Sequence, residues 1–310
     1  MGLRLLVPAA VLSGVLGLLP ARQTGPPPFA QEEPVFSARS ELVVLQVIVE
    51  NRQGEYISNL TADSFSVIED GIPQTIAFFN QQDAPVTVGL LVDSSGSMRT
   101  VRELVAAAAA SFAAGSNPRD EMFALTFGDD VRPALPRSDP FTSDSATLQR
   151  ALFDAITARG RTALYDAVVQ GLKYADAGSH ERKVLVAVSD GGDNASSATF
   201  DEIVHDAQRS NALIYTVIVR DSLETAASPR RLRRLAEQSG GEAFEPRHIG
   251  EVPSVLEHIA RDIRSMYTVG YAPAPDKGPG LRRVQVRVSG AGSGSYRVRT
   301  REAYLVENRS

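Results

Sequence analysis

Three oxygen-bearing side chains alternate directly after an apolar run, at Asp93, Ser95 and Ser97. The run before them, from Val86 to Val92, has the length and the bounding turn residues of a buried strand in a parallel sheet. One carboxylate and two hydroxyls on one loop are hard oxygen ligands, which suit Mg²⁺ or a similar cation and do not suit zinc or copper. The sequence therefore indicates a candidate cation-binding loop at the carboxyl end of a buried strand.

Two residues elsewhere in the chain can join this loop. Asp190 follows a second apolar run, Lys183 to Val188, and Thr162 stands where a helix is expected to begin. In a doubly wound sheet, ligands bind outside the carboxyl ends of the strands, where the strand order reverses. If the two strands flank that reversal, two carboxylates and three hydroxyls converge. Such a set leaves positions on a cation for water and for a carboxylate from another molecule.

The middle of the chain alternates strands with helices, which is typical of an α/β fold. We expect strands at residues 86–92, 122–127, 183–188 and 212–219, and helices at residues 101–114, 148–156, 162–177, 200–208, from Pro229 onward and across 252–263. These elements predict a doubly wound, mostly parallel sheet with helices on both faces.

Both flanks of this region resemble β structure instead. The strands expected there are at residues 41–49, 65–69 and 74–79 before the α/β region and at 267–271, 283–288 and 296–300 after it. Asp70-Gly71 favours the positive φ angles of a hairpin turn between the second and third of these. Each flank has too few strands for a stable sandwich. We expect both flanks to form one smaller antiparallel β-sandwich; the alternative is that the C-terminal strands pair only with each other.

The five oxygen-bearing residues, in their order and spacing, resemble the metal-ion-dependent adhesion site of von Willebrand factor A (VWA) domains. The resemblance implies Mg²⁺, or Mn²⁺ or Ca²⁺, bound directly by Ser95, Ser97 and Thr162. It implies that Asp93 and Asp190 act mostly through water. It also implies that the cation captures an Asp or Glu side chain of a partner protein.

The resemblance extends over about residues 85–266, and the flanks are similar to those of exported bacterial VWA proteins. We therefore expect a signal peptide and linker at residues 1–30, the first part of the β-sandwich at 36–84, the VWA domain at 85–266 and the second part of the sandwich at 267–307.

The N-terminal segment has the layout of a secretory signal. Arg4 precedes an apolar run over residues 5–19, and small residues suited to cleavage follow. The run is short for a membrane span, although an uncleaved N-terminal anchor is the alternative. We expect no other span in the mature chain, and an exported protein that is periplasmic, attached to the cell envelope or secreted.

Simpler roles exist for the same residues. Asp93, Ser95 and Asp190 could be ordinary turn or cap residues, and Thr162 could be a helix N-cap. Two arginine stripes, at residues 297, 299 and 301 and at residues 283 and 287, resemble either a contact face for an anionic polymer or the solvated face of an antiparallel pair.

Charge and missing motifs argue against other classes of function. The 310-residue chain has a formal net charge of −5, which disfavours nucleic-acid binding. It has no cysteine, no Gly-x-Ser-x-Gly elbow, no Walker loop and no histidine near a serine motif. We expect a non-enzymatic, cation-dependent protein-binding module. The alternatives are a structural component of the cell envelope that makes its contacts through the β domain, and a metal-assisted hydrolase that uses Asp93 and Asp190.

Overall fold

The computed structural model describes residues 42–96, 98, 107, 109, 112, 115–157, 159–219, 229–273, 278–289 and 296–307. All of them belong to the compact unit formed by Ser40–Ser310. The signal-like segment, Ser97 and most of the helix expected at residues 101–114 lie outside the described residues.

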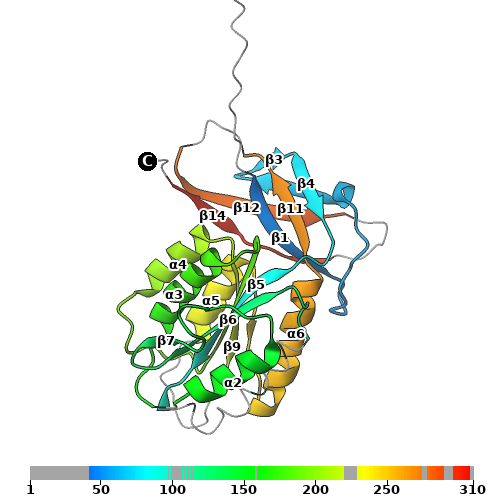
Figure 1. The fold of residues 1–310 in the computed structure, drawn as a ribbon. Helices are drawn as coiled ribbons and strands as arrows, with labels where there is room; N and C mark the ends of the chain where they lie inside the picture. The colour runs from blue at the N-terminus through cyan, green and yellow to red at the C-terminus, as the bar shows by residue number, and fades with distance from the viewer. Residues whose placement is uncertain are drawn as a thin grey trace, which may run out of the picture. The chain divides into compact units, whose positions relative to one another are not determined.

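A six-stranded sheet forms the centre of the α/β region, in the order β10-β9-β8-β5-β6-β7 (Figure 1). Its strands are β5 (Val86–Asp93), β6 (Glu121–Phe127), β7 (Val131–Pro133), β8 (Arg182–Ser189), β9 (Leu213–Ile218) and β10 (Ala243–Phe244). All neighbours pair in parallel except β6 with β7. Strand β5 lies between β6 and β8, and all eight of its residues are buried. The strand order therefore reverses at β5, so the condition under which the two candidate loops meet is fulfilled.

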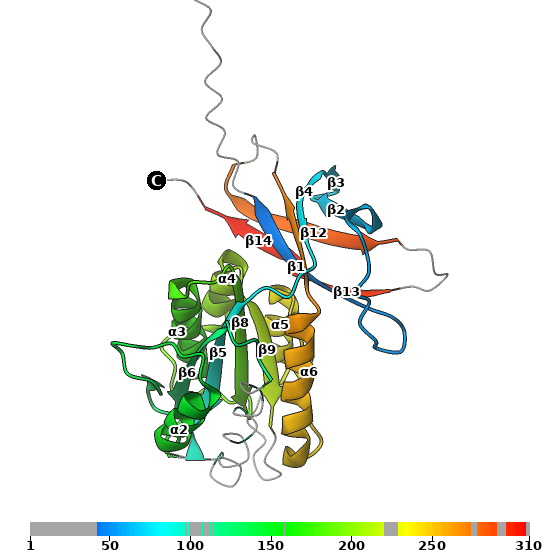
Figure 2. The ribbon, with the colours of Figure 1, turned by 45° about the vertical axis from the view of Figure 1, so that its right-hand side comes forward.

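Helices cover both faces of this sheet. They are α2 (Ser145–Ala155), α3 (Leu164–Ala177), α4 (Phe200–Arg209), α5 (Pro229–Ser239) and α6 (Val252–Arg264), with a short 3₁₀ turn, η3 (Ile249–Glu251), before the last. Apolar residues of α3, α4 and α5 share one core with the sheet, and those of α2 and α6 share the other. Figure 2 shows α6 on one side of the sheet and α3 and α4 on the other. This arrangement confirms the expected doubly wound fold.

The flanking segments form two four-stranded antiparallel sheets, in the orders β13-β1-β11-β4 and β14-β12-β2-β3. The strands are β1 (Val43–Glu50), β2 (Phe65–Glu69), β3 (Ile72–Gln74), β4 (Ile76–Asn80), β11 (Tyr267–Tyr271), β12 (Gly280–Val288), β13 (Arg297–Arg299) and β14 (Ala303–Val306), with a 3₁₀ turn, η1 (Ala62–Ser64), before β2. Each sheet combines both flanks, because β1 pairs with β11 and β2 pairs with β12. Apolar side chains of both sheets share one core. The alternative, in which the C-terminal strands pair only with each other, is wrong.

The expected single strand at residues 74–79 is also wrong. Asp70 and Gly71 form the turn with positive φ angles of 48° and 84°, as expected. The strand after this turn ends at Gln74, however, and the chain passes to the other sheet before β4 begins at Ile76. Thr75 is therefore the point at which the chain crosses between the two sheets.

The arginine stripe at the C-terminus differs from both interpretations of the sequence. The Arg297 side chain is 59% exposed, but that of Arg299 is only 10% exposed. Arg301 is buried, and its Nη1 donates to Asn211 Oδ1 of the α/β region at 3.1 Å. Arg299 and Arg301 are therefore unavailable to a polymer or to bulk solvent, because the α/β region covers them.

No helix within the described part of the chain is long and apolar enough to cross a membrane.

Candidate metal centre

Asp93 is the last residue of β5 and is 1% exposed. Its Oδ1 accepts a hydrogen bond from the N–H of Ser95 at 2.8 Å, and its Oδ2 accepts one from the hydroxyl of Ser189 at 2.7 Å. Ser189 ends the neighbouring strand β8, so this second bond joins the two strand ends. Both carboxylate oxygens of Asp93 are thus held in fixed directions at the edge of the sheet.

The electrostatic surroundings of Asp93 favour a cation. Burial is the largest cause that raises the pKa of this carboxyl to about 6, and the charge of Asp190 raises it further, while hydrogen bonds from Ser95 and Ser189 lower it. Asp93 forms no ion pair with any described residue. The two neighbouring carboxylates therefore repel each other in a site of low dielectric, and a bound cation would relieve that repulsion.

Backbone hydrogen bonds join the loop after β5 to the segment before α3. The N–H of Arg159 donates to the carbonyl of Ser94 at 2.9 Å, and the N–H of Gly96 donates to the carbonyl of Gly160 at 3.3 Å. Gly160 has a φ angle of +85°, which favours glycine at this position. These bonds bring the segment that carries Thr162 against the loop that carries Ser95.

Thr162 is 5% exposed and lies two residues before α3. The N-cap of that helix is Ala163, so the expectation that Thr162 begins and caps the helix is wrong. Its N–H donates to Asn194 Oδ1 at 2.8 Å, and its carbonyl accepts from the N–H of Asn194 at 3.0 Å. This reciprocal pair attaches Thr162 to the loop that follows Asp190.

Asp190 is 9% exposed and follows β8 directly. Because Val188 lies beside Val92 in the parallel register, the loops after β8 and β5 begin at the same edge. Asp190 Oδ1 accepts from the N–H of Gly192 at 2.9 Å. The turn role that the sequence allows for Asp190 is therefore present, and it leaves the carboxylate at the carboxyl edge of the sheet.

The structure thus brings the loops of Asp93, Ser95, Thr162 and Asp190 to one edge, with all four residues at most 9% exposed. The place of Ser97 lies outside the described residues. The donor set consists of carboxylate and hydroxyl oxygens, so it fits a hard cation. Sequence reasoning missed Ser189 and Asn194, although both stand beside Asp190 in the Ser-Asp-Gly-Gly-Asp-Asn segment.

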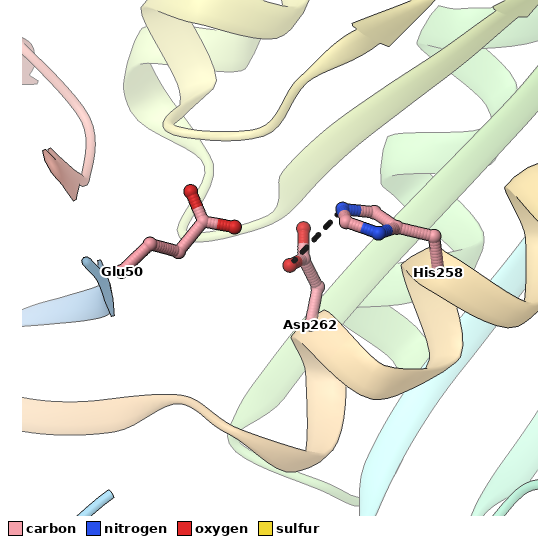
Figure 3. A group of neighbouring side chains, drawn as sticks. All are labelled: Glu50, His258 and Asp262. Atoms are coloured by element: carbon pink, nitrogen blue, oxygen red, sulfur yellow. Dashed lines mark ion pairs between the residues drawn. The ribbon is translucent and has the colours of Figure 1, made fainter. Parts of the chain in front are cut away.

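A second group with metal-ligand chemistry lies between β1 and α6 (Figure 3). Ligand atoms of Glu50, His258 and Asp262 lie within 4.8 Å of one another. Arg299 Nη2, however, lies 2.6 Å from Asp262 Oδ2 and 3.9 Å from Glu50 Oε1, and Arg299 Nη1 lies 3.2 Å from Glu242 Oε2. The guanidinium already supplies the positive charge, so this group is an ion-pair network that joins the flanking sheets to the α/β region.

Comparison with known proteins agrees with the fold. No curated protein sequence matches the chain at a significant level. A von Willebrand factor type A structure from Catenulispora acidiphila has a TM-score of 0.51 and 14% identity, over 87% of this chain and 73% of that one. Proximal thread matrix protein 1 from the mussel byssus has a TM-score of 0.52 and 13% identity, over 63% of this chain and 51% of its own. At these identities the similarity concerns the fold alone.

The family model of the von Willebrand factor type A domain matches residues 88–258. This range covers more than half of the 310 residues, and it contains Asp93, Ser95, Ser97, Thr162 and Asp190. The chain therefore belongs to the von Willebrand factor type A domain family.

Proposed function

We propose that this protein binds a partner protein through a divalent cation held at the carboxyl edge of β5 and β8. Ser95, Ser97 and Thr162 are the direct ligands in this proposal, and Asp93 and Asp190 act mostly through water. The observation that carries it is the burial of Asp93 beside Asp190, with no ion-pair partner for Asp93 among the described residues. Mg²⁺ is the expected ion, with Mn²⁺ and Ca²⁺ as alternatives.

We expect a bound cation to stabilise this edge of the sheet. It compensates the desolvation of Asp93 and removes its repulsion with Asp190, so it stabilises the folded protein. Protons compete with it, because the pKa of Asp93 is raised to about 6. Cation binding is therefore expected to weaken as the pH falls below that value.

The ligand set supports the proposal of a protein partner. Three hydroxyls and two carboxylates that act through water leave a hard cation with a coordination position for an outside oxygen. A carboxylate of an Asp or Glu side chain supplies the charge that neutral hydroxyl ligands lack. Arg159 lies beside this edge and can attract such an acidic partner, whereas the Nε of Arg161 is paired with Asp129 Oδ1 at 3.0 Å.

The histidines support a role without catalysis. His180 Nε2 lies 2.9 Å from the carbonyl of Arg119, and His258 belongs to the Arg299 network. His205 and His248 lie beside Asp206 and Glu251 on the surface. None of these contacts involves a proposed cation ligand, so a general base of that type is not placed at the site.

The same proposal includes the domain boundaries and the cellular location of the protein. We place a signal peptide and linker at residues 1–30, the VWA domain at 85–266 and the two parts of the β-sandwich at 36–84 and 267–307. The signal-like segment supports an exported protein of the periplasm, the cell envelope or the medium.

Isothermal titration of Mg²⁺ tests the proposal. We expect saturable binding by the wild-type protein and none by the Asp93→Ala variant. The matched control is Asp154→Ala, which removes an exposed carboxylate of α2 and should bind as the wild type does. Equal heats from wild type and Asp93→Ala would instead favour a structural component that makes its contacts through the β domain.

A further inference from the structure

Helix α5 carries a cluster of arginines on its first two turns. Arg230, Arg231 and Arg234 are exposed, whereas Leu232 and Leu235 are buried against the sheet. We call these three exposed residues the α5 arginine cluster. Arg233 is not a member, because its guanidinium is paired with Glu245. The cluster is an unexplained concentration of positive charge on a chain with a net charge of −5.

The α5 arginine cluster lies at the same edge of the sheet as the proposed cation site. Near the other end of the helix, the N–H of Ile214 donates to Ser239 Oγ at 2.8 Å. Ten residues of helix span about 15 Å, which equals four to five residues of strand. The start of α5 is therefore level with the end of β9 at Ile218, which pairs with Ser189, the residue before Asp190.

Two contacts hold the guanidinium groups in place. Arg231 Nη1 donates to the hydroxyl of Tyr165 at 2.9 Å. The guanidinium carbons of Arg231 and Arg234 lie 5.8 Å and 5.6 Å from the centre of the Phe200 ring. Stacked arginines lose less rotamer freedom when they bind an anion, so the cluster is preorganised for that purpose.

The same contacts connect the cluster to the cation site. Tyr165 lies in the first turn of α3, three residues after Thr162, and its N–H donates to Asp193 Oδ1 at 3.1 Å. Asp193 is adjacent to Asn194, which binds Thr162. The loop after Asp190 thus contacts both Thr162, a proposed cation ligand, and Tyr165, the residue that orients Arg231.

Among the residues that the structure describes, acidic charges compensate only one member of the cluster. The negative charges of Asp193 and Asp201 attract the Arg231 guanidinium. Arg230 and Arg234 form no ion pair with any residue that the structure describes. The Asp166 carboxylate of α3 accepts from the N–H groups of Ser197 and Ala198, and the Glu202 carboxylate of α4 accepts from the N–H of Thr199.

We infer that the α5 arginine cluster binds a second acidic group of the same partner, so that the ligand is an acidic polypeptide segment with several carboxylates. One carboxylate binds the cation, and a neighbouring acidic side chain binds Arg230 and Arg234. This inference rests on the proposed function, because it shares the cation site. It adds that a single Asp or Glu is not enough for full affinity.

Poly-L-glutamate is the probe for this inference, with Mg²⁺ present and binding followed by fluorescence anisotropy. The test variant is Arg230→Gln/Arg234→Gln. The matched control is Arg283→Gln/Arg287→Gln, which removes the same charge from two exposed positions of β12. We expect the test variant to bind about fivefold more weakly than wild type, since each exposed charge contact contributes modestly, and the control to match wild type. Chelation of Mg²⁺ should weaken binding by all three proteins.

Equal affinities of the test and control variants would overturn the inference, and so would a failure of poly-L-glutamate to bind the wild type in Mg²⁺. Titration of Mg²⁺ alone separates the two proposals. If the wild type binds Mg²⁺ and the test variant keeps its affinity for the polymer, only the arginine inference fails. If the wild type does not bind Mg²⁺, the proposed function fails.

Discussion

Replacement of Arg299 by alanine is expected to destabilise the protein strongly. The Arg299 guanidinium lies 2.6 Å from Asp262 Oδ2, and the side chain of Asp262 is 0% exposed. Glu50, another partner, has a side chain that is 4% exposed. Removal of the guanidinium leaves these buried carboxylates without their main positive charge, and only the more exposed Arg297 remains near Glu50.

The magnitude follows from the burial of the pair. Loss of one partner of a buried ion pair costs about 3–5 kcal/mol, because the remaining charge stays desolvated. Arg297→Ala is the matched control on the same strand. Arg297 contacts Glu50 and Glu242 at 3.5 Å and 2.9 Å, but its side chain is 59% exposed. Its removal should cost at most about 1 kcal/mol.

Urea unfolding followed by far-UV circular dichroism measures both variants, since the chain has no tryptophan. A double variant, Arg299→Leu/Asp262→Asn, should recover part of the loss, because it removes the uncompensated charge of Asp262 and keeps an acceptor for the hydroxyl of Tyr56. Equal midpoints for Arg299→Ala and Arg297→Ala would refute the reasoning, because the buried network would then contribute no more than an exposed pair.

Three other predictions follow from the same structure. Thr162→Val should weaken Mg²⁺ binding in a calorimetric titration and change the free energy of unfolding by about 1 kcal/mol or less, because Thr162 does not cap α3 and its backbone bond to Asn194 remains. The pKa of Asp93 is raised to about 6 in the folded state, above its unfolded value, so the folded state binds more protons between the two values. The metal-free protein should therefore gain stability from this group as the pH falls from 7 to 5, by about 1 kcal/mol, and Asp93→Asn should remove that contribution in urea titrations at several pH values. Gly240→Ala should lower the thermal midpoint in a calorimetric scan, because Gly240 has a φ of +89° and an added Cβ would lie 2.5 Å from the backbone nitrogen of Arg301; an unchanged midpoint would contradict this close approach.

The positions of two candidate ligands could be predicted because each stands at the end of an apolar run in the sequence. Asp93 and Asp190 each follow an apolar run that is long enough for a buried strand and too short for a buried helix. Polar residues at such strand ends must lie at one edge of a parallel sheet. The capping role of Thr162 was wrong because the sequence cannot distinguish a cap from a residue that lies two positions before the helix.

Other features depend on contacts that local sequence does not encode. Arg299 alternates with Val298 and Thr300 as a residue on a solvated strand face would, and its burial depends on contacts with distant residues such as Asp262 of α6 and Glu242. Thr75 gives no sign that the chain changes sheets there, although the segments on both sides of it, Ile72–Gln74 and Ile76–Asn80, each form a strand. Ser189 looks like the last residue of a buried strand, and its bond to Asp93 follows from the parallel register of β5 and β8.

Crystals soaked in Mn²⁺ and measured for anomalous scattering test the central claim most directly. The proposed function predicts one strong peak at the carboxyl edge of β5, bound by the hydroxyls of Ser95, Ser97 and Thr162 and bridged through water to Asp93 and Asp190. A peak at Glu50, His258 and Asp262 instead, or no peak at the edge of β5, would contradict it.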